Sequence, residues 1–130
     1  ATPLKDGTVL ITGGFSDGKP TDTAELYDPK TGLSVEMPAM EEARAGHGAT
    51  LLSDGKVFLS GGIGTDGVSR STEIFDPQRG DFVAGPVMRA SRSLHVSVAV
   101  SGNQVLLSGG YQGNSTYTRV SRVVDHEVNR

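Results

Sequence analysis

The chain has 130 residues, of which 35% are hydrophobic and 21% are charged, and its formal net charge is −3 at pH 7. That length and composition fit one globular domain, and the weak negative charge argues against nucleic-acid binding, which requires a basic surface. The absence of cysteine excludes disulfides and thiolate chemistry within this chain, and no apolar run is long enough to cross a membrane. The 18 glycines, about twice the ordinary usage, indicate many tight turns between short strands.

The sequence repeats itself at an interval of 48 residues. Each copy has a Gly-Gly pair, at positions 13–14, 61–62 and 109–110. At the same offset, Ala-Glu-Leu-Tyr-Asp-Pro at 24–29 falls on Thr-Glu-Ile-Phe-Asp-Pro at 72–77. The third copy is weaker: its counterpart, 121–126, aligns only after one extra loop residue, and His126 replaces the proline. A fixed period of this size predicts repeated structural units of about 40 to 50 residues.

Each unit is predicted to contain four short antiparallel strands. The first unit begins within an innermost strand, since residues 1–4 align with 49–52. The second unit shows the whole pattern, with strands expected at 48–52, 56–60, 72–75 and 82–84. Asp54-Gly55 is a two-residue hairpin signal between the first two strands, and the third ends at Asp76-Pro77 because proline cannot continue a ladder. In the third unit, strands are expected at 96–100 and 105–108. No stretch has a sustained helical period.

Four antiparallel strands in a unit of this length form the blade of a β-propeller. The order Arg-x-x-His, apolar strand, Asp-Gly, apolar strand, Gly-Gly, variable loop, Glu-x-(Tyr/Phe)-Asp-Pro resembles the kelch repeat, particularly that of exported bacterial kelch proteins and of the galactose-oxidase-like propeller. The expected fold is therefore all-β, with kelch-type blades at about 1–46, 47–94 and 95–130 in an incomplete ring. The resemblance also implies an extracellular or periplasmic location.

One position departs from the kelch pattern. The family usually has tryptophan after the Asp-Pro turn, where this chain has Ser34 and Phe82. We therefore expect thinner packing between blades, especially around Ser34.

The chain falls a little short of three blades, whereas a closed propeller needs at least four. A lone arc would expose apolar blade faces and unpaired strand edges. We therefore expect either that the chain is a piece of a larger propeller or that it associates head-to-tail with copies of itself.

Several motifs that suggest cofactors fail on their context. The phosphate-loop spacing at 13–19 is followed by Pro20 and a strand, not by Ser or Thr and a helix. The Gly-x-Gly-x-x-Gly run at 62–67 also leads into a strand, where a dinucleotide site needs a helix. A copper-radical oxidase centre would need a cysteine, and the histidines at 47, 95 and 126 stand in separate units. The sequence therefore predicts no cofactor, no metal site and no catalytic residue.

The candidate binding surface is the end of the blades that carries the loops after Gly-Gly. These loops differ in every copy, at 15–22, 63–70 and 111–118, and variable loops on a rigid frame commonly carry recognition. Strand parity places them at the same end as the connections that carry Arg44 and Arg92. In similar kelch propellers, arginines at this position line the pocket for acidic peptides. The resemblance thus implies a ligand site formed by Arg44, His47, Arg92, His95 and Tyr111.

The same repeated residues have a structural alternative. Residues that recur with a repeat often serve the repeat itself, so Arg-x-x-His could hydrogen-bond the neighbouring blade. Glu25 and Glu73 also recur; they lie one blade apart, too far for an acid–base pair. We expect them to accept hydrogen bonds from nearby backbone or arginines.

The function expected from the sequence is a non-catalytic propeller module that binds a protein segment or a glycan, with other blades or other copies as partners and with neither nucleic acid nor membrane. Two alternatives remain open. The chain could be a fragment of a kelch-class enzyme, such as a sugar epimerase or oxidase, whose catalytic groups lie elsewhere. It could also be a purely structural assembly unit.

Overall fold

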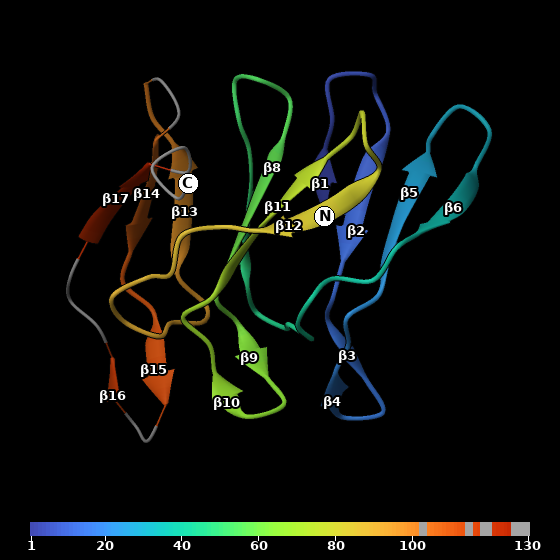
Figure 1. Cartoon of the computed structure of the whole chain (residues 1–130). Helices are drawn as coiled ribbons and strands as arrows, with labels where there is room; N and C mark the ends of the chain where they lie inside the picture. Colours follow the sequence, from blue (N-terminus) through green and yellow to red (C-terminus); the bar gives the residue numbers. More distant parts are fainter. Residues whose placement is uncertain (102–103, 114–115, 118–120, 126–130) are drawn as a thin grey trace.

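The computed structural model describes residues 1–101, 104–113, 116–117 and 121–125. Over these residues the fold is all-β, without helices, and its strands form three main antiparallel sheets (Figure 1). In that part of the chain there is accordingly no helix that could span a membrane.

The first blade is a four-stranded sheet in the order β1-β2-β5-β6. Its strands are β1 (Thr2–Pro3), β2 (Val9–Thr12), β5 (Ala24–Asp28) and β6 (Leu33–Met37). The turn before β2 is closed by Asp6, whose carboxylate accepts hydrogen bonds from the backbone N–H and the hydroxyl of Thr8, at 2.9 and 2.6 Å. These bonds lower the pKa of Asp6. The predicted Asp-Gly hairpin is thereby held by its own side chain.

The second blade repeats this sheet in the order β7-β8-β11-β12. It consists of β7 (Gly48–Leu51), β8 (Val57–Ser60), β11 (Thr72–Asp76) and β12 (Asp81–Ala84). The four predicted strands of this copy are all present, with ends that differ by one residue at most.

The third blade is a three-stranded sheet over the described residues, in the order β13-β14-β17. Its strands are β13 (Val96–Ala99), β14 (Gln104–Ser108) and β17 (Ser121–Asp125). The turn predicted at 102–103 and the residue His126 lie outside the described residues.

Pairing registers show that the repeat is structural as well as sequential. Glu25 pairs with Ile11, Glu73 pairs with Leu59, and Arg122 pairs with Leu107. Each pair is the counterpart of the others in its own blade. The one-residue shift in the third copy is thus absorbed before β17, and the strand returns to the common register.

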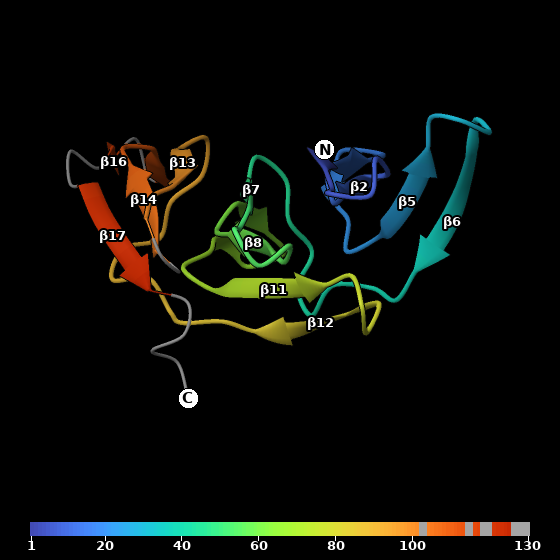
Figure 2. The same ribbon diagram turned by 90° about the horizontal axis from the view of Figure 1, so that it is seen from above.

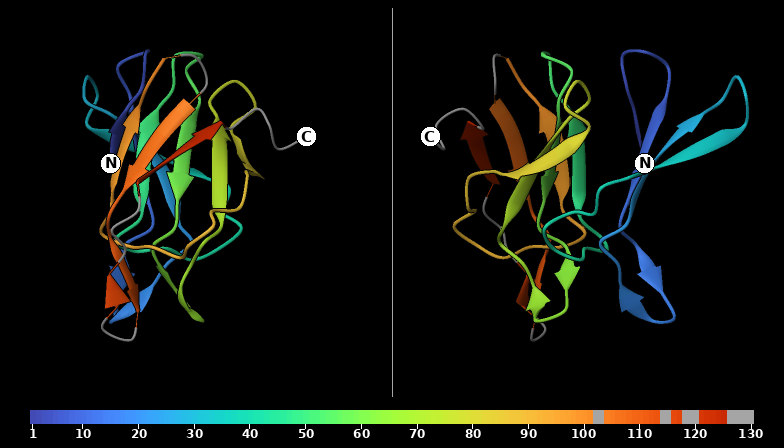
Figure 3. Two further views of the ribbon diagram at one scale, coloured as in Figure 1. Left: turned by 90° about the vertical axis from the view of Figure 1, so that its left-hand side faces the viewer. Right: turned by 45° about the vertical axis from the view of Figure 1, so that its right-hand side comes forward.

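Each variable loop forms a small two-stranded hairpin of its own, which the sequence did not reveal. The hairpins are β3 (Phe15–Ser16) with β4 (Lys19–Pro20), β9 (Ile63–Gly64) with β10 (Gly67–Val68), and β15 (Tyr111–Gly113) with β16 (Thr116–Tyr117). All three extend from the same end of the blades (Figures 1 and 3).

The blades stand side by side in an arc that does not close over the described residues (Figure 2). The innermost strands β1, β7 and β13 are neighbours along the arc. One apolar cluster, which includes Leu10, Leu59 and Phe75, fills the space between the first and second blades. A second cluster, which includes Phe58, Met88 and Leu107, fills the space between the second and third. The core is therefore divided between blades, and each blade depends on its neighbours for burial.

In the second blade, Phe82 stands where the kelch resemblance implies a tryptophan. Phe82 is buried, and its ring lies 5.0 Å from that of Phe75, centroid to centroid. Ser34 is exposed in the first blade. The contact between the Phe75 and Phe82 rings thus contributes to the packing of one blade interface, that between the first and second blades.

The two ends of the blades carry different connections, as strand parity predicts. The turns at 54–56 and 76–78 line one shallow depression together. The hairpin β9–β10 and the connection at 41–43 line another at the opposite end. The segments 38–47 and 85–95, which join one blade to the next, are called crossovers below.

Candidate functional site

Arg44 belongs to the first crossover and connects two blades. Its backbone N–H donates to the carbonyl of Thr21 at 3.1 Å, and its carbonyl accepts from the N–H of Gly14 at 2.7 Å, both in the first blade. Its side chain extends into the second blade, where it is 0% exposed. Arg44 therefore links the backbone of the first blade to the interior of the second.

The guanidinium of Arg44 is fully engaged there. Its Nε and Nη2 donate to Oε2 of Glu73, at 3.0 and 2.8 Å. Its Nη1 donates to the carbonyls of Gly61 and Ser71, at 2.8 and 3.1 Å, and Nη2 also donates to Oγ of Ser71, at 2.9 Å. These bonds use all five N–H groups of an arginine.

The carboxylate of Glu73 collects hydrogen bonds from the same crossover. Its Oε1 accepts from the backbone N–H of Glu41 at 2.7 Å, and its Oε2 accepts from that of Glu42 at 3.3 Å. Glu73 is 1% exposed. The expectation that this glutamate accepts from backbone and arginine is confirmed. A pair buried this deeply is retained only because every charge is met by hydrogen bonds.

Arg92 repeats the connection between the second and third blades. Its N–H donates to the carbonyl of Ser69 at 3.1 Å, and its carbonyl accepts from the N–H of Gly62 at 2.9 Å. Its buried Nη1 donates to the carbonyl of Gly109, at 3.0 Å, in the third blade. The glutamate does not recur, because Arg122 occupies the register position of Glu73.

The two histidines reach in the opposite direction, back to the preceding blade. His47 Nε2 lies 2.9 Å from Oγ1 of Thr12, and His95 Nε2 lies 2.8 Å from Oγ of Ser60. Burial lowers the pKa of both histidines to about 4, and the positive charges of Arg44 and Arg92 contribute to the shift. Both imidazoles are therefore neutral at pH 7 and act as hydrogen-bonding groups between blades.

The Gly-Gly pairs make room for these crossovers. A Cβ on Gly13 would lie 2.2 Å from the carbonyl oxygen of Arg44, and a Cβ on Gly61 would lie 2.2 Å from that of Arg92. Both glycines also have positive φ, at 62° and 60°. Only glycine allows the crossover backbone to approach so closely while adopting that conformation.

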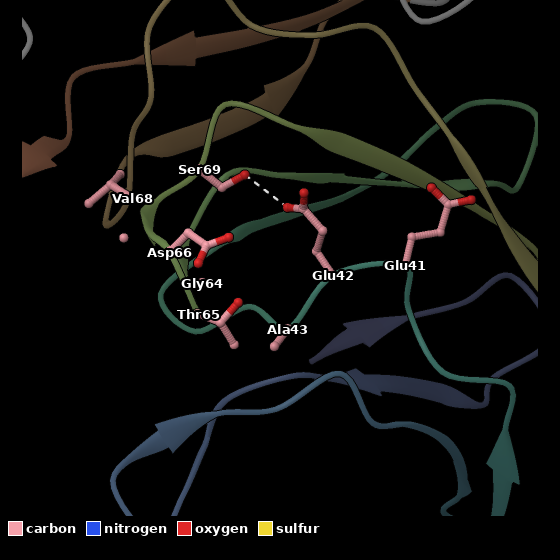
Figure 4. A pocket seen from close by; sticks show the side chains of 9 residues that line it. Glu41, Glu42, Ala43, Gly64, Thr65, Asp66, Val68 and Ser69 are labelled. Atoms are coloured by element: carbon pink, nitrogen blue, oxygen red, sulfur yellow. Dashed lines mark hydrogen bonds between the residues drawn. The ribbon is translucent and has the colours of Figure 1, made fainter.

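A polar pocket of about 240 Å³ opens at the variable-loop end of the second blade (Figure 4). It is lined by residues 41–43 of the crossover and residues 64–69 of the β9–β10 hairpin. Glu42 and Asp66 contribute carboxylates, and in the view Glu42 is turned toward Ser69 while Glu41 lies at the edge. In the described part of the chain, no group of histidine and acidic side chains could hold a metal ion.

Glu42 also supports the wall of this pocket. Its Oε2 accepts from the hydroxyls of Ser71 and Ser69, at 2.6 and 3.0 Å, and lies 3.9 Å from Nη2 of Arg44. The hydrogen bond from Ser71, more than the nearby Arg44 charge, lowers the pKa of this carboxyl group. The carboxylate is thus ionised at neutral pH, which makes the pocket negative.

Comparison with protein families supports the repeat. Residues 3–41, which comprise most of the first blade, match the kelch motif. The first blade therefore contains a kelch motif. No curated protein matches the chain.

The structure places the predicted arginines and histidines between blades. Arg44 and Arg92 are 0% and 1% exposed, and His47 and His95 are turned toward hydroxyls of the preceding blade. Tyr111 begins β15, and its backbone N–H and carbonyl exchange hydrogen bonds with Ser93, at 2.8 and 2.9 Å. None of the five residues lines either of the two pockets described above. The contacts of the arginines and histidines agree with the structural alternative for Arg-x-x-His.

Sequence reasoning missed the residues that line the pocket of the second blade. Glu41, Glu42 and Asp66 do not recur, since the positions 48 residues from them hold Arg89, Ala90 and Gly18 or Asn114. The lack of acidic counterparts in the other copies was the available signal. A residue that does not recur is not required by the repeat, and it can therefore have a function in one blade alone.

Proposed function

We propose that this kelch chain is a non-catalytic binding module that holds a positively charged segment of a partner protein against its variable-loop end. The observation that carries the proposal is the pocket between residues 41–43 and 64–69, which has carboxylates on its walls. Lysine and arginine side chains complement such a pocket in charge and in hydrogen bonding.

The chemistry of the lining supports a protein segment over a glycan. Sugar sites commonly offer an aromatic platform, whereas this lining contains carboxylates, hydroxyls and small side chains. An acidic ligand, which Arg44 and Arg92 would suit if they were exposed, has little support because both guanidinium groups are buried.

The test is a titration of the isotope-labelled chain with the peptide Gly-Lys-Gly-Lys-Gly and, separately, with a neutral linear pentasaccharide. Backbone amide shifts should move at 41–43 and 64–69 with the peptide and not with the sugar. Raising the salt concentration should weaken the binding, because the contacts are electrostatic.

Asp66→Asn is the informative variant, and it should weaken peptide binding by about three- to tenfold. Asp17→Asn is its matched control, because it makes the same charge change in the equivalent hairpin of the first blade, outside this pocket. No shift at the pocket with millimolar peptide, or equal loss in both variants, would contradict the proposal.

A further inference from the structure

The first blade contains acceptor groups equivalent to those that bind the Arg44 side chain in the second blade. In the second blade those groups are the Gly61 carbonyl, the Ser71 carbonyl and hydroxyl, and the Glu73 carboxylate. The first blade has Gly13, Thr23 and Glu25 at the equivalent positions. The carbonyl of Thr23 accepts from the N–H of Gly13 at 2.9 Å, as that of Ser71 does from Gly61 at 3.0 Å. The local frame of the arginine receptor is therefore the same.

No described residue pairs with the carboxylate of Glu25 in an ion pair. Its cross-strand neighbour Ile11 is 36% exposed, whereas Leu59, the neighbour of Glu73, is 0% exposed. Glu25 itself is half-buried, and Glu73 is buried. The receptor of the first blade is thus open to solvent where that of the second is covered by a crossover.

The path of an incoming backbone is also open. A Cβ on Gly62 would lie 2.9 Å from the Ala45 carbonyl and from the His47 Cβ, because the crossover runs there. A Cβ on Gly14, the equivalent glycine, would meet nothing within 4 Å. This second observation is independent of the carboxylate, and it indicates space for an extended segment beside the receptor.

The charges around Glu25 also favour a positively charged ligand. Glu36 on β6 is the direct cross-strand partner of Glu25, whereas the partner of Glu73 is Ala84. Two carboxylates at adjacent positions favour a cation over a neutral side chain.

We propose that the arginine receptor of the first blade, formed by Gly13, Thr23 and Glu25, binds an arginine on an extended segment that resembles the crossover of a kelch blade. The guanidinium donates to the Glu25 carboxylate and to the acceptors of Gly13 and Thr23. The carboxylate also accepts backbone N–H groups from the residues three and two positions before the arginine, as Glu73 does from Glu41 and Glu42. This site is separate from the pocket at 41–43 and 64–69.

The probe is an end-capped peptide with the sequence of residues 38–48, Pro-Ala-Met-Glu-Glu-Ala-Arg-Ala-Gly-His-Gly, titrated into the whole chain by calorimetry and amide shifts. Binding should be saturable, with one peptide per chain and shifts centred on 13–14 and 23–25. Citrulline in place of the arginine removes the charge at nearly constant shape and should weaken binding at least about tenfold. Proline in place of the first glutamate removes one backbone donor and should also weaken it.

On the protein, Glu25→Gln should weaken binding at least about tenfold, and Glu36→Gln by less than about threefold. Thr23→Ala, which removes one hydroxyl acceptor, is the second variant in case Glu25→Gln unfolds, and a thermal melt of each variant establishes that it is folded. The proposal is overturned if millimolar peptide gives no saturable binding. It is equally overturned if the citrulline peptide binds as well as the parent, or if folded Glu25 and Thr23 variants bind as the wild type does.

Discussion

Arg44 and Glu73 form an ion pair with 2.8 Å between Nη2 and Oε2, although the backbone of Arg44 is hydrogen-bonded to the preceding blade. His47, three residues later, reaches back to Thr12. The crossover therefore carries one polar side chain in each direction, and the Arg-x-x-His pattern makes this pair of contacts at both described junctions between blades. Apolar packing between blades is non-directional, whereas these hydrogen bonds are directional and fix the position of one blade against the next.

The two histidines predict how stability depends on pH. Their folded pKa of about 4 lies below the unfolded value of about 6.5, so the unfolded chain binds more protons between these values. Stability contributed by the neutral imidazoles is thus complete above about pH 6.5 and is lost as the pH falls toward 4. Because both side chains are partly exposed, we expect a loss on the order of 1–2 kcal/mol for each histidine.

Urea unfolding at pH 7 and at pH 4.5 measures this loss. The double variant His47→Gln/His95→Gln keeps a hydrogen-bonding side chain at each position without an ionisable group in this range. It should show a much smaller difference between the two pH values, and an unchanged difference would mean that other groups cause the pH dependence.

The Gly-Gly pairs predict that replacing a glycine with alanine lowers the stability of the chain by an amount that depends on the position. Gly61→Ala should destabilise the chain by more than about 2 kcal/mol, because its Cβ would overlap the carbonyl oxygen of Arg92. Gly109→Ala is the matched control: its φ of 70° is similar, but nothing lies within 4 Å of its Cβ. It should cost only the strain of the left-handed conformation, about 1 kcal/mol. Thermal or urea melts compare the two, and equal costs would contradict the close approach of the crossover.

The strands of the second blade could be predicted from the sequence because each depends on local signals. Asp54-Gly55 closes a hairpin, Pro77 follows the end of β11, and the 48-residue offset transfers both to other copies. The side-chain direction of Arg44 could not be predicted, since ligand binding and blade contact both require a repeated arginine at the same place. The pocket at 41–43 and 64–69 was hidden for the opposite reason, because its acidic residues occur in one copy.

The third blade predicts self-association. Val96 and Val98 on β13 are 58% and 47% exposed, and they face away from the second blade because Ser97 between them contacts Thr50. We propose that this face packs against the first blade of another copy, as blades pack within the chain. Sedimentation velocity should show species heavier than 13.6 kDa that grow with concentration.

Val98→Lys should shift this distribution toward the monomer, because it places a charge in the middle of the proposed contact. Val83→Lys is the control, since Val83 is 39% exposed on the outer strand β12. A wild-type chain that sediments as a monomer at every concentration would rule out the association.

The most direct test of the account is a double-mutant cycle on Arg44 and Glu73, with Arg44→Met, Glu73→Leu and the double variant compared by urea unfolding. Each single substitution should cost about 3–5 kcal/mol because it leaves a buried charge without its partner, and the double variant should cost no more than either. Glu25→Leu, in the equivalent position of the first blade, should change stability by less than about 1 kcal/mol. Additive costs, or single costs no larger than that of Glu25→Leu, would contradict the claim that this ion pair joins the blades.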